Sequence, residues 1–124
     1  MTQFKHVKEA NSRHLVKAFY HALCGLKTIF QDDMAFKQEV FLTVIVIPLA
    51  LFLGTTAVER VILIGCWFLV LLMEIINSSI EAVVDRISLE IHPLSKKIKD
   101  MSAAAVLLSI INAITVWLII ILSR

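Results

Sequence analysis

One segment of the chain carries a row of polar side chains that could do chemistry inside an apolar environment. The row consists of Glu74, Asn77, Ser78, Glu81 and Asp85. At about 100° per residue in a helix, the two glutamates, the asparagine and the aspartate fall within a sector of about 80°, on one face. A carboxylate inside a bilayer costs about 2.5–3.5 kcal/mol even on insertion scales, so such groups face protein or water and indicate a functional site.

The row runs from membrane depth to the cytoplasmic surface. Glu74 lies about 20 Å along the helix from Val61, and Asp85 reaches the surface. Such a ladder of polar groups can connect a buried lipid headgroup with a soluble ligand. The alternative is that these residues only cross-link helices by hydrogen bonds worth about 0.6–2 kcal/mol each. Two glutamates cost more to place in the membrane than such hydrogen bonds return, which argues against this alternative.

Further charged residues lie where the neighbouring predicted helices meet the cytoplasm, namely Asp32, Asp33, Lys37, Glu39, Lys99 and Asp100. Carboxylates that converge from different helices suggest a divalent cation, and hard oxygen ligands favour Mg²⁺. Taken singly, each of these residues could equally be a solvated helix end, and His92 alone fits a loop histidine better than a ligand. No GxxxxGK[ST] or GxGxxG motif is present, so motif rules alone predict no ATP site.

The elements that must position these residues are transmembrane helices. The chain is 59% hydrophobic, against roughly 45–50% in an ordinary soluble domain, and the excess requires a non-aqueous solvent. Three long uncharged stretches approach the ~20 residues that span a hydrocarbon core. We therefore predict an all-α integral membrane protein with one membrane domain over 1–124, transmembrane helices at 35–53, 61–87 and 101–123, and a cytoplasmic loop at 88–100.

An amphipathic helix is predicted before the first span, over residues 4–32. Apolar residues recur there at steps of three and four from Leu15 to Phe30, with basic residues between them. This pattern suits a helix that lies flat in the headgroup region, although the same periodicity would serve a helix packed on protein. Lys and Arg are concentrated in residues 1–39 and 86–99, so the N-terminus and the long loop are expected to be cytoplasmic.

Several other classes of protein are excluded or disfavoured. The net charge is only +2, and the basic residues are split among segments, so nucleic acid is an unexpected partner. Cys24 and Cys66 fall in different helices without metal-ligand spacing, so neither a disulfide nor a zinc site is predicted. The first 34 residues lack a compact apolar stretch with a cleavage site, so no removable signal peptide is expected.

The residues from Glu74 to Arg86 read EIINSSIEAVVDR and resemble, nearly letter for letter, the E-(I/L)-x-N-(S/T)-x-I-E-x-x-V-D signature of the small prokaryotic diacylglycerol kinases. The segments at 99–106 and 35–39 are similar to further parts of that family. The resemblance implies a homotrimer of three-span subunits in the bacterial inner membrane, each with an N-terminal surface helix. It also implies that the protein uses Mg-ATP to phosphorylate 1,2-diacylglycerol to phosphatidate.

The same resemblance implies roles for individual residues. Glu74 would be the general base with Asn77 beside it, and Asp33 and Glu81 would hold Mg²⁺. The implied nucleotide contacts are His14, His21, Asp33, Glu81, Glu90, His92, Lys99 and Asp100. The implied contacts to the lipid substrate are Gln38, Glu39, Glu74 and Ala103. The chain departs from the family pattern at Asp33, where a glutamate is usual, and at His14 and His21, where enterobacterial members have Arg and Tyr.

Two alternative functions remain open at this stage. Undecaprenol kinases share the E-x-x-N-x-x-x-E signature, although the segment from Phe36 to Glu39 looks like the diacylglycerol type. A small proton-coupled transporter is the alternative from a different class. The acidic row opens only to the cytoplasm, and the 54–60 turn offers little beyond Glu59 and Arg60 on the far side, which argues against a transporter.

Overall fold

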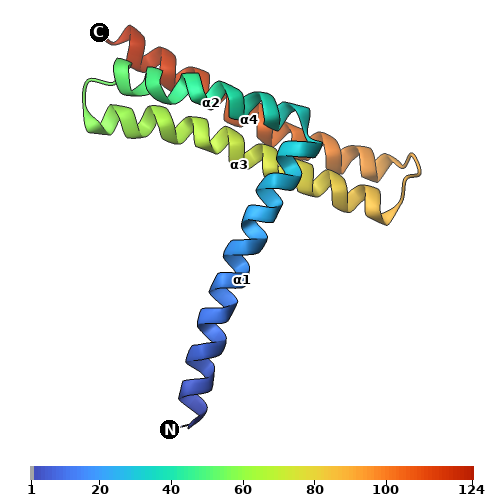
Figure 1. The fold of residues 1–124 in the computed structure, drawn as a ribbon. Helices are drawn as coiled ribbons and strands as arrows, with labels where there is room; N and C mark the ends of the chain where they lie inside the picture. The colour runs from blue at the N-terminus through green and yellow to red at the C-terminus, as the bar shows by residue number, and fades with distance from the viewer. Residues whose placement is uncertain (1) are drawn as a thin grey trace. The chain divides into compact units, whose positions relative to one another are not determined.

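A computed structural model describes the backbone of residues 2–124 and the side chains from Asn11 onward. It contains four helices in the order α1 (Thr2–Asp32), α2 (Met34–Leu53), α3 (Ala57–Ile87) and α4 (Pro93–Leu122), and no strand within the described residues (Figure 1). The all-helical prediction is therefore confirmed. The chain divides into two units, one formed by α1 and the other by residues 33–124.

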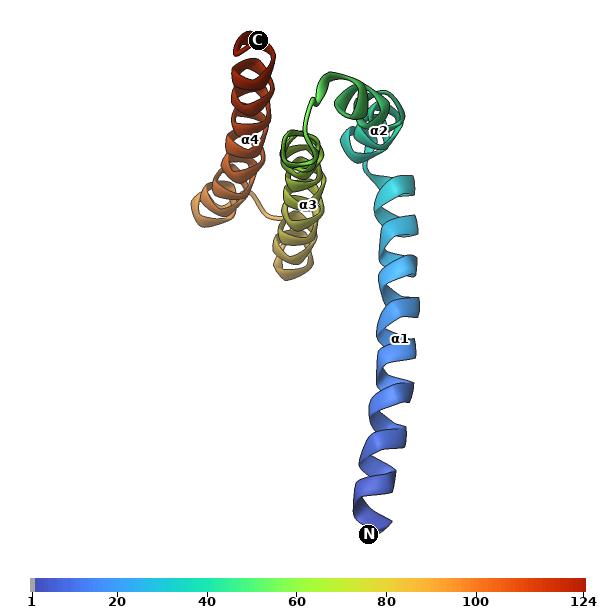
Figure 2. The ribbon, with the colours of Figure 1, turned by 90° about the vertical axis from the view of Figure 1, so that its left-hand side faces the viewer.

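The second unit consists of three long helices that lie side by side. Its central helix is α3, which packs against α2 on one side and more extensively against α4 on the other (Figure 2). Each of the three helices is long and apolar enough to cross a membrane, as predicted. The residues of the acidic row therefore lie on the one helix that has neighbours on both sides.

A small apolar core joins α3 and α4. Cys66, Val70 and Ala113 are buried together, and Val116 and Trp117 pack against them. Indole N–H groups provide polar cross-links at the same depth. The Trp117 Nε1 donates to the Leu63 carbonyl at 3.3 Å, and the Trp67 Nε1 donates to the Thr43 hydroxyl of α2 at 2.8 Å. Such interhelical hydrogen bonds leave no indole donor unsatisfied in an apolar environment.

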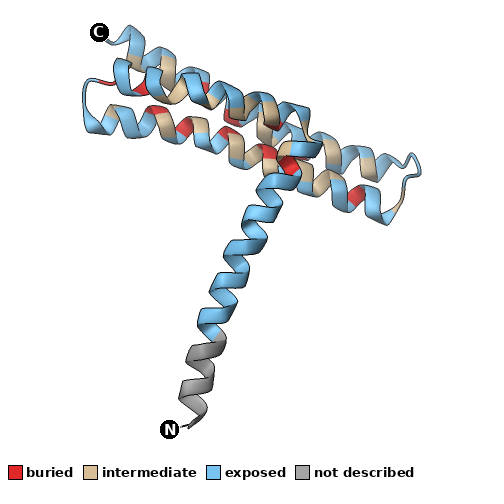
Figure 3. Cartoon of the chain, viewed as in Figure 1, coloured by how far each residue is buried: buried red, intermediate tan, exposed pale blue. Residues whose placement is uncertain are grey.

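Most of the remaining surface of α2, α3 and α4 is exposed and apolar (Figure 3). Phe52, Leu72 and Leu108 are examples of large apolar side chains on this surface. Their exposure is expected for helices that face lipid tails or other copies of the chain, because neither environment penalises an apolar surface.

The turn between α2 and α3 is closed by polar contacts at the end of the bundle opposite the acidic row. Gly54 ends α2, and a Cβ at this position would collide with the Arg60 side chain, which donates through Nε to the Gly54 carbonyl at 3.1 Å. Glu59 accepts hydrogen bonds from the Thr55 backbone and hydroxyl and pairs with Arg124 at 3.1 Å. The backbone of Gly54 has a φ of −68°, which suits any residue. The close approach of Arg60, and not the backbone conformation, therefore favours glycine here.

The last helix begins earlier than its uncharged stretch suggests. α4 starts at Pro93, so Lys99 and Asp100 lie on a helix, and the connection between α3 and α4 is limited to residues 88–92. Proline suits the first position of a helix, because its φ is already helical and it has no N–H to satisfy. His92 is the N-cap and accepts the Leu94 N–H through Nδ1 at 3.1 Å. The charged residues before position 101 indicate where the span leaves the membrane, but the helix itself begins earlier, at Pro93.

The first unit is one continuous helix of 31 residues, α1. It contains the whole of the predicted segment 4–32, of which the side chains before Asn11 lie outside the described ones. Every side chain from Asn11 to Thr28 is exposed within the chain. The helical part of this prediction agrees with the structure, and its placement in the headgroup region stays a prediction.

Candidate functional site

The acidic row on α3 is centred on a buried carboxylate. Glu74 is 7% exposed, and it is the one buried charged residue among the side chains that the structure describes. Asp33 from the start of α2 and Glu81 from the next turns of α3 lie close enough for their charges to act on Glu74. A carboxylate that is removed from solvent and placed near two others is costly, and such a cost is characteristic of functional sites.

Asp33 connects the beginning of α2 with the row on α3. Its Oδ1 accepts the Phe36 N–H at 3.0 Å and thereby caps α2, while its Oδ2 accepts a hydrogen bond from the Ser78 hydroxyl. The short aspartate arm is suited to capping, because an N-cap oxygen must reach back to the first turn of its own helix. Asp33 therefore has a fixed position beside the row, and its carboxylate retains further lone pairs for a ligand.

A second set of contacts joins the row to α4. The Ser102 hydroxyl donates to the Asn77 Oδ1 at 2.7 Å, and the Asn77 Nδ2 faces the Glu81 Oε1 at 3.4 Å. Ser102 is only 8% exposed, so this contact lies inside the α3–α4 interface. The asparagine amide consequently links a buried hydroxyl of α4 to a carboxylate of the row.

Lys99 brings a positive charge from α4 to the cytoplasmic end of the row. Its Nζ pairs with the Asp85 Oδ1 at 2.7 Å, and the charge of Glu81 also acts on it. Both partners of this ion pair are partly exposed, and exposed pairs contribute little to stability. Lys99 can therefore exchange Asp85 for another anion at small cost.

Glu39 on α2 adds another carboxylate close to the row. Its Oε2 is buried and has no hydrogen-bond partner among the residues that the structure describes, and the charges of Glu74 and Asp33 act on it. A catalytic role, a bound ion or an ordered water accounts for such an oxygen in native proteins. Glu39 lies two turns into α2 from Asp33.

Oxygen ligands for a metal ion are available, although they do not form a complete cage. Within the described residues, no group of three or more His, Cys, Asp or Glu side chains is placed to hold a metal ion. Mg²⁺ is usually bound by one or two carboxylates together with waters and substrate phosphates, so a dedicated cage is not required. The carboxylates of Asp33 and Glu81, with the unsatisfied oxygen of Glu39 nearby, fit this mode of binding.

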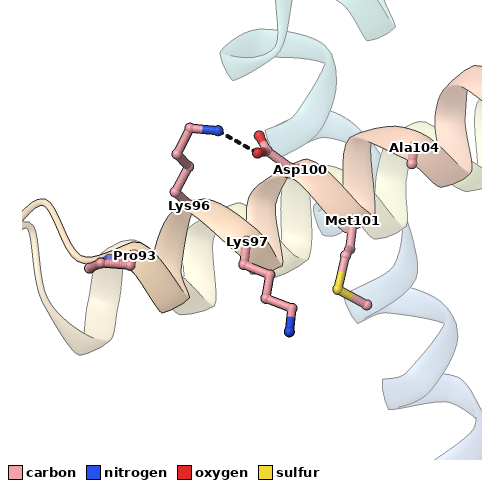
Figure 4. Close-up of a pocket in the computed structure, with 6 residues that line it drawn as sticks. All are labelled: Pro93, Lys96, Lys97, Asp100, Met101 and Ala104. Atoms are coloured by element: carbon pink, nitrogen blue, oxygen red, sulfur yellow. Dashed lines mark hydrogen bonds and ion pairs between the residues drawn. The ribbon is translucent and has the colours of Figure 1, made fainter.

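Asp100 does not join Lys99 at the row. It pairs instead with Lys96 at 2.6 Å on the outer face of α4 (Figure 4). This pair borders a surface hollow of about 420 Å³ whose lining residues are Pro93, Lys96, Lys97, Asp100, Met101 and Ala104. The structure therefore places two adjacent candidates for nucleotide binding on different faces of the helix.

The other predicted contacts are distributed more widely. Glu90 is exposed in the connection between α3 and α4, and His92 serves as the N-cap of α4. Gln38 and Ala103 are exposed on α2 and α4. His14 and His21 are exposed on α1, which is a separate unit, and His21 packs edge-on against Tyr20.

Two hydroxyl groups of the site received no role from the sequence. Ser78 belongs to the row, and the structure shows that it holds Asp33. Ser102 was not singled out, although it lies one turn after Lys99 in a stretch where most neighbours are apolar. That spacing places both residues on related faces of the helix, and it is the signal that could have identified Ser102.

Comparison with known proteins agrees with the family resemblance that the residues of the row carry. Residues 20–121 match the family model described as prokaryotic diacylglycerol kinase. A diacylglycerol kinase of Escherichia coli (strain K12) is 42% identical over 110 residues, which cover 89% of this chain and 90% of the relative. Diacylglycerol kinases of Haemophilus influenzae and Pseudomonas aeruginosa are each 40% identical over 110 residues, covering 93% and 89% of those relatives.

Proposed function

The chain belongs to the prokaryotic diacylglycerol kinase family, and from that premise we propose which of its residues carry the reaction. It is a diacylglycerol kinase, a phosphotransferase with an alcohol acceptor, and a multi-pass bacterial membrane protein with a lipid substrate. Our proposal is that the row on α3, with Asp33 and Lys99, is its active site and that Mg-ATP is the phosphoryl donor. The observation that carries this proposal is the burial of Glu74 between the charges of Asp33 and Glu81.

Glu74 is the proposed general base. Phosphoryl transfer to an alcohol requires a group that accepts the hydroxyl proton as the oxygen attacks the γ-phosphorus. Glu74 lies deepest of the carboxylates on the row, where the glycerol hydroxyl of a lipid can reach it while the acyl chains stay in the bilayer. Asn77, one turn towards the cytoplasm, orients the neighbouring Glu81 through its amide.

Asp33 and Glu81 are the proposed Mg²⁺ ligands, together with phosphate oxygens of the nucleotide. A Mg²⁺ ion held by these residues would supply positive charge to offset the charge of the transferred phosphoryl group. Lys99 contributes a further positive charge when it exchanges Asp85 for a phosphate oxygen, since charge-assisted hydrogen bonds to phosphate strengthen as negative charge develops. These residues supply the positioning and charge compensation that the reaction demands.

The remaining contacts are proposed for the lipid substrate and for the nucleotide. Gln38, Glu39 and Ala103 would contact the lipid substrate, and Glu90, His92 and Asp100 the nucleotide. His92 now caps α4 and Asp100 pairs with Lys96, so both must change partners to bind a nucleotide. His14 and His21 of α1 complete the proposed nucleotide contacts, with α1 lying at the cytoplasmic surface of the inner membrane.

We also propose that the functional molecule is a homotrimer. A helix that carries a row of carboxylates must have that row screened from lipid, and three spans are few for this purpose. The large exposed apolar surfaces of α2 and α4 are compatible with contacts between copies of the chain. The distribution of Lys and Arg supports the proposal that the N-terminus and the α3–α4 connection lie in the cytoplasm.

The test is a direct phosphorylation assay. Purified protein in mixed micelles, supplied with labelled ATP and Mg²⁺, is expected to transfer label to diacylglycerol and to leave undecaprenol unlabelled. Omission of Mg²⁺ should abolish labelling, and the Glu74→Gln variant serves as the control for a contaminating kinase. Label on undecaprenol alone would assign the protein a different acceptor, and label on neither lipid would refute the proposed reaction.

A further inference from the structure

Ser102 on α4 contacts Asn77 of the row inside the α3–α4 interface. It is 8% exposed, and its hydroxyl lies 2.7 Å from the Asn77 Oδ1 and 3.0 Å from the Lys99 carbonyl. A hydroxyl carries one proton, so Ser102 donates to the nearer acceptor, the Asn77 Oδ1, and the Lys99 carbonyl is only the more distant alternative acceptor that a helical serine has in its own backbone. The contact with Asn77 crosses between two helices and requires a separate explanation.

An amide group is planar, so a bond that fixes its oxygen also fixes the direction of its NH₂ group. Ser102 donates to the Asn77 Oδ1, and the Asn77 Nδ2 is then directed at the Glu81 Oε1 at 3.4 Å. At this distance the amide–carboxylate contact is weak and does not hold the amide by itself. The bond from Ser102 therefore determines whether the amide donates to Glu81 or turns away from it.

We infer that Ser102 is a positioning residue, which holds the Asn77 amide so that Glu81 presents its carboxylate in the orientation that binds the metal–nucleotide complex. The inference rests on the proposed function, because Glu81 is a metal ligand only within that proposal. Ser78 acts in a parallel way on the other proposed ligand, since its hydroxyl donates to Asp33. Each proposed ligand is thus oriented by a polar neighbour on α3, and for Glu81 that neighbour is in turn fixed from α4.

The chain supplies a matched control in Ser109, which lies two helical turns further along α4. Ser109 is also buried, at 5% exposure, and its hydroxyl donates within α4, to the Val106 carbonyl at 2.6 Å. It has no part in the proposed active site. Ser102→Ala and Ser109→Ala each remove a buried hydroxyl from α4, and only Ser102→Ala removes a bond to Asn77.

The experiment measures metal–nucleotide affinity in two ways, by the KM for Mg-ATP and by Mn-ATP binding followed by EPR without turnover. We expect Ser102→Ala to weaken both by about five-fold, the effect of losing one hydrogen bond, with an unchanged KM for diacylglycerol. Ser109→Ala should leave both at the wild-type values. Ser102→Thr, which restores the hydroxyl, should recover Mn-ATP affinity.

Thermal denaturation of the same variants separates positioning from a general loss of stability. If Ser102→Ala and Ser109→Ala lower the unfolding temperature equally while only Ser102→Ala weakens Mn-ATP binding, the positioning role holds. Equal Mn-ATP affinity in the two alanine variants, or a threonine variant as weak as alanine, would overturn it. The proposed function is tested independently by whether the wild type phosphorylates diacylglycerol.

Discussion

At the scale of single residues, Glu74 is the position where a catalytic role can be distinguished from a structural one. A buried carboxylate near two others is retained despite its cost, which is expected of a group that must accept a proton. Glutamine has nearly the same size and hydrogen-bonding capacity, but it accepts no proton at neutral pH and is cheaper to hold in the membrane. The substitution therefore removes the proposed function of the side chain and leaves its packing.

We predict that Glu74→Gln loses about 10²–10⁴ of kcat, the usual range for general-base catalysis. The unfolding temperature should stay equal or rise, and the affinity for ATP should change little, because the base acts on the lipid hydroxyl. Steady-state kinetics and thermal unfolding of the purified variant check this. A destabilised protein with near-normal specific activity would instead identify Glu74 as a structural residue.

Lys99 is a cation that pairs with Asp85 of the row, whereas Lys97 lies on the same helix and borders the outer hollow. We predict that Lys99→Met lowers kcat/KM for ATP by at least ~10-fold, which corresponds to ~1.4 kcal/mol of transition-state stabilisation. The kcat/KM of Lys97→Met for ATP should remain within about two-fold of the wild type, since a solvent-exposed charge away from the row contributes little. Equal losses in the two variants would mean that both lysines act only through the general positive charge of this surface.

At the scale of elements, Asp33 combines two functions that can be separated by substitution. It caps α2 and accepts from Ser78, and it is a proposed metal ligand. Asparagine is as good an N-cap as aspartate, whereas a longer side chain places its carboxylate beyond the first turn. The departure from the family's usual glutamate therefore has a structural counterpart in the cap of α2.

We predict opposite effects for two substitutions of Asp33. Asp33→Asn should keep the unfolding temperature, because it retains the cap. It should also weaken the affinity for Mg²⁺-nucleotide, so that more Mg²⁺ is needed for half-maximal activity, because it removes the charge. Asp33→Glu should keep the charge and lower the free energy of unfolding by about 0.5–2 kcal/mol, because it removes the cap. Thermal unfolding and Mg²⁺ titrations of activity measure both. A glutamate variant as stable as the wild type would show that the cap contributes nothing.

At the scale of the whole molecule, the membrane orientation decides which end of the bundle meets the proposed donor, ATP. The basic residues that flank the row lie on the same side as the α3–α4 connection, and the turn with Thr55 lies at the opposite end of α3. Because basic flanks stay in the cytoplasm, the row should open inward. A reaction that consumes ATP requires this orientation.

We predict that a membrane-impermeant maleimide labels Thr55→Cys in intact spheroplasts and labels Leu89→Cys only after permeabilisation. Both side chains are exposed, at the two ends of α3. The experiment uses a Cys24→Ser background, because Cys24 is an exposed thiol, and it retains the buried Cys66. The reverse pattern of labelling would place the row outside the cytoplasm and exclude cytosolic ATP as the donor.

The amino-acid sequence by itself determined the helical membrane fold and the row on α3. Hydropathy and helical spacing are local properties, and a carboxylate such as Glu74 within an apolar stretch is visible without any tertiary contact. The early start of α4 at Pro93 was missed, because its charged first turns are helical without being apolar.

Only the tertiary structure decided which residues act on the row from other helices. Asp33 meets Ser78, Lys99 meets Asp85, and Ser102 meets Asn77 across interfaces whose partners are separated by 14 to 45 positions in the chain. It also separated Asp100 from Lys99, although the two are adjacent in the sequence. The physical reason is that successive residues of a helix point about 100° apart, so the packing of α3 against α2 and α4 selects which polar side chains meet.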